Sequence, residues 1–145
     1  MITCKRITPC DTVILDHGSH VLTAVSIFDA IVPDAYPHAL PRLGLGMFFE
    51  RDADDPHTLK FVVKLRFGDE CFFTSNVFTL DFFDETHARY ALNITIAGCL
   101  VPAPGSLSAE VWDAAPAGKM IDNVRILFGN APTKTPTPKH DRTLQ

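Results

Sequence analysis

Apolar and polar residues alternate with period two along much of this chain, and this pattern restricts its fold more than any other feature. The range 58–67 is the clearest case, because every second residue is large and apolar and most residues between them are basic. Successive side chains of a β-strand point to opposite faces, so this range is predicted to be a half-buried strand. Gly68-Asp69-Glu70 then predicts a tight turn, and 71–80 a returning strand that completes a hairpin.

Similar patterns predict further short strands along the rest of the chain, at 12–15, 21–28, 43–49, 89–97, 107–111 and 120–128. The first two flank His17-Gly18-Ser19 and predict a second hairpin, whereas 29–41, with three prolines, predicts an irregular crossing. Gly44 and Gly46 alternate within one strand and suggest a bulge or a close backbone approach. Parallel strands need long crossovers, usually helical, so the expected fold is an all-β antiparallel sandwich of about eight strands, immunoglobulin-like or jelly-roll-like.

The 145 residues fit one domain, which we expect to span 1–129. The range 130–145 is rich in proline and threonine and is expected to form a polar, extended tail. The formal net charge is −4 and no basic stripe is visible, which argues against nucleic acid and anionic membranes as partners. No apolar run approaches the ~20 residues of a membrane helix or forms a signal peptide, so a cytoplasmic protein, or one assembled there into a particle, is expected.

Phenylalanine is unusually frequent, with 11 residues against 2 Tyr and 1 Trp. Six of them form three consecutive pairs, Phe48-Phe49, Phe72-Phe73 and Phe82-Phe83. On a strand, each pair sends one ring into the sandwich and one outward. An exposed Phe forfeits roughly 1.5–3 kcal/mol of burial free energy, so three outward rings predict a subunit or partner interface. The alternatives are that loops or the 29–41 crossing cover these rings, or that bulges turn both rings inward.

Histidines and carboxylates gather in three turns. In the first turn, His17 and His20 would need His38, His57 or His87 to complete a metal site. The second is the acidic loop 52–55, which could bind Ca²⁺. The third contains Asp81, Asp84 and Glu85 with His87, which could supply the carboxylate pair of a glycosidase. None has the complete spacing of its class, so solvated turns are favoured. No catalytic residue, cofactor or metal ion is therefore predicted. Four scattered cysteines are expected to be reduced rather than bridged or zinc-bound, and Cys71 and Cys99 to be buried.

Two stretches carry a family resemblance. The range 21–31, followed by Tyr36-Pro37 and the strand from Leu43, resembles a group of small bacterial proteins of unknown function. The range 90–111, a strand, a Pro-Gly turn and another strand, is similar to the end of many immunoglobulin-like sandwich domains. The resemblance covers 11–128, implies a β-sandwich, and implies no catalytic residue and no function.

These observations predict a non-enzymatic binding or assembly module, acting as a homo-oligomer or as a component of a larger particle. Its partner would be itself or another protein. One alternative is a carbohydrate- or small-ligand-binding sandwich that uses Trp112 or Tyr36 for stacking. Another is a small hydrolase that uses the acidic loops.

Overall fold

The protein is described by a computed structural model that covers residues 2–16, 21–82, 89–116 and 118–130. Within these ranges it has ten strands and no helix, which confirms the all-β prediction with two strands more than expected. The strands are β1 (Thr3–Asp16), β2 (Val21–Ile27), β3 (Ala30–Ile31), β4 (His38–Glu50), β5 (Thr58–Phe67), β6 (Glu70–Thr74), β7 (Phe78–Asp81), β8 (Arg89–Val101), β9 (Gly105–Asp113) and β10 (Met120–Phe128). The part of the chain that the structure describes therefore offers no helix able to span a membrane.

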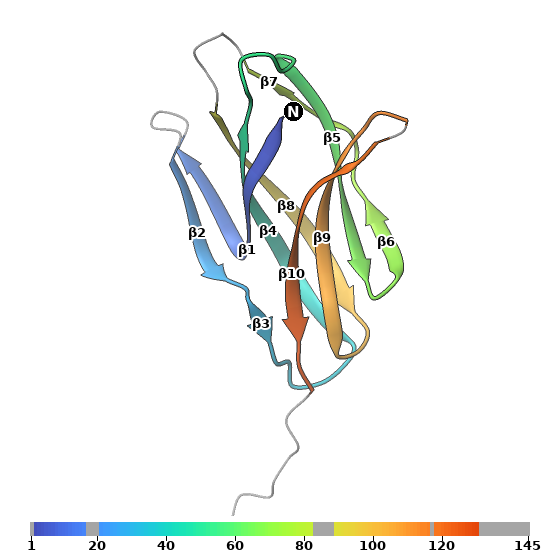
Figure 1. The fold of residues 1–145 in the computed structure, drawn as a ribbon. Coiled ribbons are helices and arrows are strands. Elements are labelled where there is room, and N and C mark those ends of the chain that lie inside the picture. The colour runs from blue at the N-terminus through green and yellow to red at the C-terminus, as the bar shows by residue number, and fades with distance from the viewer. Residues whose placement is uncertain (1, 17–20, 83–88, 117, 131–145) are drawn as a thin grey trace, which may run out of the picture.

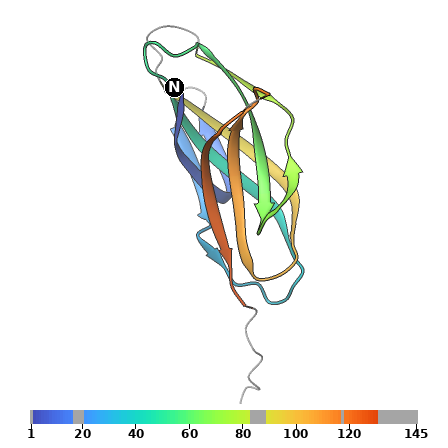
Figure 2. The same ribbon diagram turned by 45° about the vertical axis from the view of Figure 1, so that its right-hand side comes forward.

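The strands form two sheets packed face to face (Figure 1). One sheet has the order β2-β1-β4-β8, and the other has the order β3-β10-β9-β5-β6, with β7 also paired to β5. Figure 2 shows β9, β10 and β5 in front of the sheet that contains β4 and β8. The core lies between the sheets, and its largest fully buried side chains are Phe49, Phe61, Leu43, Leu45, Met47, Leu65, Leu80, Leu107, Ile126, Val63, Val101 and Val111.

The predicted hairpin from residue 58 to residue 80 forms, but its second strand is divided. Phe67 pairs with Glu70 across the tight turn, as expected. Ser75 then interrupts the ladder: its hydroxyl accepts a hydrogen bond from the Val63 N–H at 2.8 Å, and its own N–H donates to the Val63 carbonyl at 2.9 Å. A side chain thus replaces a backbone acceptor, and the returning strand splits into β6 and β7.

The irregular crossing predicted for 29–41 is wrong at both ends. β3 lies within it, and β4 begins at His38. β3 pairs with β10 in parallel, with Leu127 opposite Ala30 and Phe128 opposite Ile31. The expectation of purely antiparallel sheets is therefore wrong here. A parallel pair needs a long crossover, and strands β4 to β9, which lie between β3 and β10 in the sequence, provide it.

The β1–β2 hairpin is the end of the four-stranded sheet and folds over the outer side of β4. The chain turns back within β1, and the second half of β1 runs with β2 along the outer side of the sheet (Figure 1). Cys10 and Val13 are buried there, although neither belongs to the core between the sheets. A methyl group at Gly44 would lie 3.1 Å from Val13 Cγ2, whereas one at Gly46 would lie 3.6 Å from Leu22 Cδ1. The Cys10 carbonyl oxygen would lie 3.2 Å from the same methyl group at Gly44, so the predicted close backbone approach is confirmed at Gly44 but not at Gly46.

Candidate binding surfaces

The phenylalanine pairs follow the predicted in-and-out alternation where both rings are described. Phe49 is 1% exposed and its ring centroid lies 5.1 Å from that of Phe61, whereas Phe48 faces the other side of β4 and is half-buried. Phe73 is half-buried against the core, whereas Phe72 is 41% exposed. Phe72 is thus the only one of the five described candidates that is well exposed to solvent.

The third pair is described at Phe82 alone. Phe82 is 2% exposed and packs edge-on against Tyr90, with 6.1 Å between ring centroids. It directly follows β7 and continues the inward alternation of Phe78 and Leu80. Phe83 lies outside the described residues.

Charged side chains surround Phe48. Its strand neighbours are Arg6 on β1 and Ala91 on β8, and a shallow groove of about 310 Å³ beside it is lined in part by Lys5, Arg6 and Arg89. Arg89 Nε lies 3.5 Å from Glu50 Oε2 across the strand pair. Phe48 therefore contributes to a mixed polar surface and does not form an apolar patch.

The larger exposed apolar surface lies on the β1–β2 hairpin, away from the paired phenylalanines. Ile14, Val21 and Val25 are 53%, 55% and 43% exposed. Ile14 is opposite Thr23, and Val25 is opposite Thr12, so Ile14, Val21 and Val25 share the solvent-facing side of the hairpin. On its other side, Val13 and Leu22 face the glycines of β4. We call Ile14, Val21 and Val25 the hairpin face. Its signal in the sequence was that both sides of a predicted hairpin strand were apolar.

The same hairpin ends in an unprotected edge. β2 pairs only with β1 among the strands that the structure describes, so its other edge makes no strand pairing there. From Val21 to Phe28 the sequence contains no charged residue, no proline and no glycine. Soluble proteins usually protect a free edge with charge, proline or a bulge, and an edge without these devices is a site for pairing with another strand.

Trp112 lies on the outer face of the other sheet in a polar cluster. Its Nε1–H donates to Glu110 Oε1 at 3.0 Å, and Arg66 Nε lies 3.4 Å from the same oxygen. Lys64 Nζ lies 4.6 Å from the centre of the Trp112 ring, which is a cation–π contact. Glu110 is only 7% exposed, so the cluster fixes the indole and places a lysine over one of its faces.

Tyr36 has a packing role. Its ring is partly buried against the core, and its hydroxyl donates to the carbonyl of Gly129, just after β10. Burial raises the pKa of this hydroxyl, which keeps it a donor. Tyr36 therefore ties the segment before β4 to the end of the last strand, and its hydroxyl is already occupied.

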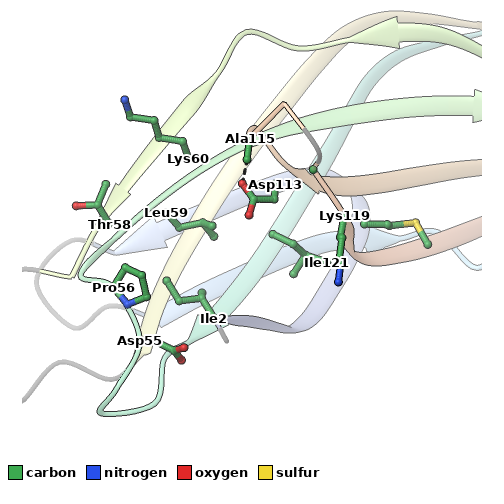
Figure 3. A pocket seen from close by; sticks show the side chains of 12 residues that line it. Ile2, Asp55, Pro56, Thr58, Leu59, Lys60, Asp113, Ala115, Lys119 and Ile121 are labelled. Carbon is green, nitrogen blue, oxygen red and sulfur yellow. Dashed lines mark hydrogen bonds between the residues drawn. The ribbon is translucent and has the colours of Figure 1, made fainter.

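A cleft of about 420 Å³ opens at one end of the sandwich (Figure 3). Ile2, Leu59 and Ile121 gather in its apolar part, while Asp55 and Asp113 lie on different sides of it. Both carboxylates serve local turns: Asp55 accepts from the Asp52 N–H at 2.7 Å, and Asp113 accepts from the Ala115 N–H at 3.0 Å. Both described carboxylates of the cleft therefore already serve the fold and do not converge on a ligand.

The acidic loop 52–55 already contains a cation. Arg51 is 5% exposed, and its Nη2 donates to the carbonyls of Ala53 at 3.4 Å and Asp55 at 3.0 Å. A guanidinium thus occupies carbonyls that a calcium ion would need. Across the ranges that the structure covers, no group of three or more potential ligands could hold a metal ion. Asp81 of the glycosidase interpretation accepts a hydrogen bond from Thr58. Outside the described ranges lie the other residues of the metal and glycosidase interpretations, His17, His20, Asp84, Glu85 and His87.

The cysteines are all free thiols. Cys99 is buried as predicted, but the same prediction is wrong for Cys71, which is exposed because β6 lies at the edge of its sheet. Burial raises the pKa of Cys4 to about 12, with a smaller contribution from the negative charge of Asp122. Such a thiol is a poor nucleophile, since thiolate is the reactive form.

No protein-family model matches this sequence, and a search of curated proteins found no match to it. Evidence about function therefore comes from the surfaces described above.

Proposed function

We propose that this protein is a non-enzymatic assembly module that buries apolar surface against another protein chain, in the first place a second copy of itself. The observation that carries this proposal is the hairpin face. Three β-branched side chains there remain 43–55% exposed although they lie together on one side of a two-stranded layer. Full burial of such a side chain contributes about 1.5–3 kcal/mol, so covering the group would favour association substantially.

The remaining exposed apolar residues support more than one contact per subunit. Phe72 on β6 and Leu100 on β8 are 41% and 56% exposed, and neither lies on the hairpin. Single exposed apolar residues are normal on a protein surface. Their separation from the hairpin face nonetheless fits a component of a larger particle better than a simple dimer, because a particle subunit has several neighbours.

Light scattering coupled to size-exclusion chromatography tests the proposal with the full chain. We expect a mass of at least two subunits at about 100 μM, and a fall toward the monomer mass of 16.0 kDa on dilution. A chain that stays monomeric over the whole range would contradict self-assembly.

Ligand binding at Trp112 is the second candidate. The cluster around this indole fixes the ring orientation, which is a requirement of a stacking platform, and Lys64 covers one ring face. A sugar would have to use the other face or displace the lysine. Because Trp112 is the only tryptophan of the chain, its fluorescence reports binding directly during titration with oligosaccharides. An unchanged emission spectrum across a glycan panel would remove this candidate.

A further inference from the structure

We infer that the free edge of β2 pairs with β2 of a second copy in antiparallel orientation, with the two-fold axis at Thr23. This inference rests on the proposed self-assembly and specifies its contact. The backbone groups on the outer side of β2 have no neighbouring strand among the described residues, so the natural occupant of this edge is another β-strand.

The composition of β2 favours a second copy as that strand. An isologous contact brings the same strand of both copies together, so any charges of one sign in that strand would face each other and oppose association. Val21–Ile27 contains no charge. The contact also needs a straight strand, and Ser26, with φ of 56°, interrupts the extended conformation near the end of β2. The usable edge is therefore Val21–Val25, whose centre is Thr23.

Pairing about Thr23 matches the exposed side chains. In an antiparallel pair with this axis, Val21 lies opposite Val25 of the second copy, Val25 opposite Val21, and the two threonines opposite each other. Directly opposed side chains lie on the same face with Cβ atoms about 4.5–5.5 Å apart. The contact would thus contain two Val21–Val25 pairs, one on each side of the axis, and would cover side chains that are 55% and 43% exposed in one copy.

The hairpin itself gains from this contact. A two-stranded ribbon is marginally stable in water, whereas three or more strands with an apolar face are stable. The β1–β2 layer would become a four-stranded layer, held on both copies by the packing of Val13 and Leu22 over the glycines of β4. An edge of five residues is short, so the dimer is expected to be weak, with a dissociation constant on the order of micromolar or above.

Charge substitutions at Val21 and Val25 test both the edge and its register. In V21K/V25K each lysine faces a lysine of the second copy, and the dissociation constant should rise about tenfold or more. In V21E/V25K each glutamate faces a lysine, and the dimer should persist. Positions four residues apart on one strand are separated by about 13 Å, so the two substituted residues do not pair within one copy. Val77→Lys, at a residue 55% exposed outside the hairpin, is the control and should leave the dimer intact.

Three results would overturn the inference, and circular dichroism of each variant verifies folding. If V21K/V25K dimerises as the native chain does, the β2 edge is not the contact, although self-assembly stands. If V21E/V25K is as monomeric as V21K/V25K, the register about Thr23 is wrong. If the native chain is monomeric at every concentration, the proposed function fails, and this inference fails with it.

Discussion

Replacing either glycine of β4 by alanine tests the packing of the outer layer, and we expect the two substitutions to have opposite effects. Both glycines lie on one strand, two residues apart, with the hairpin above them. A methyl group at Gly44 would lie 3.1 Å from Val13 Cγ2, 3.2 Å from the Cys10 carbonyl oxygen and 3.3 Å from Cys10 Sγ. A methyl group at Gly46 would have its nearest neighbours at 3.6 Å, an ordinary contact distance.

The expected magnitudes follow from these distances. Both substitutions restrict the unfolded chain equally, which stabilises the folded state by about 0.4–1 kcal/mol where the added methyl group fits. We expect this gain at Gly46. At Gly44 the neighbours are a buried valine and backbone, so overpacking should lower the free energy of unfolding by about 1–3 kcal/mol. The difference between the two variants, about 2 kcal/mol, isolates the packing of the outer layer.

Urea denaturation followed by circular dichroism, at one protein concentration for all variants, measures both values. The double variant G44A/V13A provides a second measurement: truncating Val13 removes the closest contact, so the two changes should couple favourably. If Gly44→Ala is as stable as Gly46→Ala, the hairpin does not rest on β4 as described.

Four further predictions concern single side chains. Only Cys71 should react with a thiol reagent at pH 8 in the folded protein, whereas all four thiols should react in denaturant. More than one rapidly reacting thiol in the folded protein would contradict the burial of the other three cysteines. Burial raises the pKa of Cys4 from 9.0 to about 12, so the stabilising contribution of its neutral thiol is complete below pH 9 and is lost as the pH rises toward 12. The free energy of unfolding should therefore fall less steeply with alkaline pH in Cys4→Ala than in the native chain. Glu110→Ala should lower the free energy of unfolding by about 1.5–3 kcal/mol and shift the Trp112 emission. Glu110→Gln should retain the indole hydrogen bond and much of the stability, and an equal loss of stability in both variants would argue against that bond. Tyr36→Phe removes one partly buried donor and should lower the free energy of unfolding in the same urea assay, and no change would show that this hydrogen bond contributes nothing.

The sequence predicts most strands correctly, because the burial of one face of each sheet imposes period two. The predicted inward residues of β9, Leu107, Ala109 and Val111, are all at most 1% exposed. Ile94 and Ile96 of β8 are buried as expected. Local alternation is sufficient for these strands, because each has one face on the core and one face toward solvent.

Features that depend on contacts between distant segments could not be predicted in this way. The division at Ser75 requires its hydroxyl to meet the Val63 N–H, and the β3–β10 pair joins the two ends of the domain. The candidate surface was misplaced for the same reason. Paired phenylalanines indicate two apolar directions on a strand, but they do not show that Phe48 is flanked by arginines while the hairpin valines remain uncovered.

The turn within β1 gives one strand two different environments. Ile7, in its first half, pairs opposite Met47 and belongs to the main core, whereas Val13, in its second half, rests on a single strand from outside. Backbone amides exchange with solvent at rates set by the smallest opening that frees them. Amides of the second half can be released when the outer hairpin lifts, while those of the first half require β1 to leave β4 and its side chains to leave the core. A single strand of fourteen residues would thus show a step in deuterium uptake near Cys10, with fast labelling beyond it and slow labelling before it.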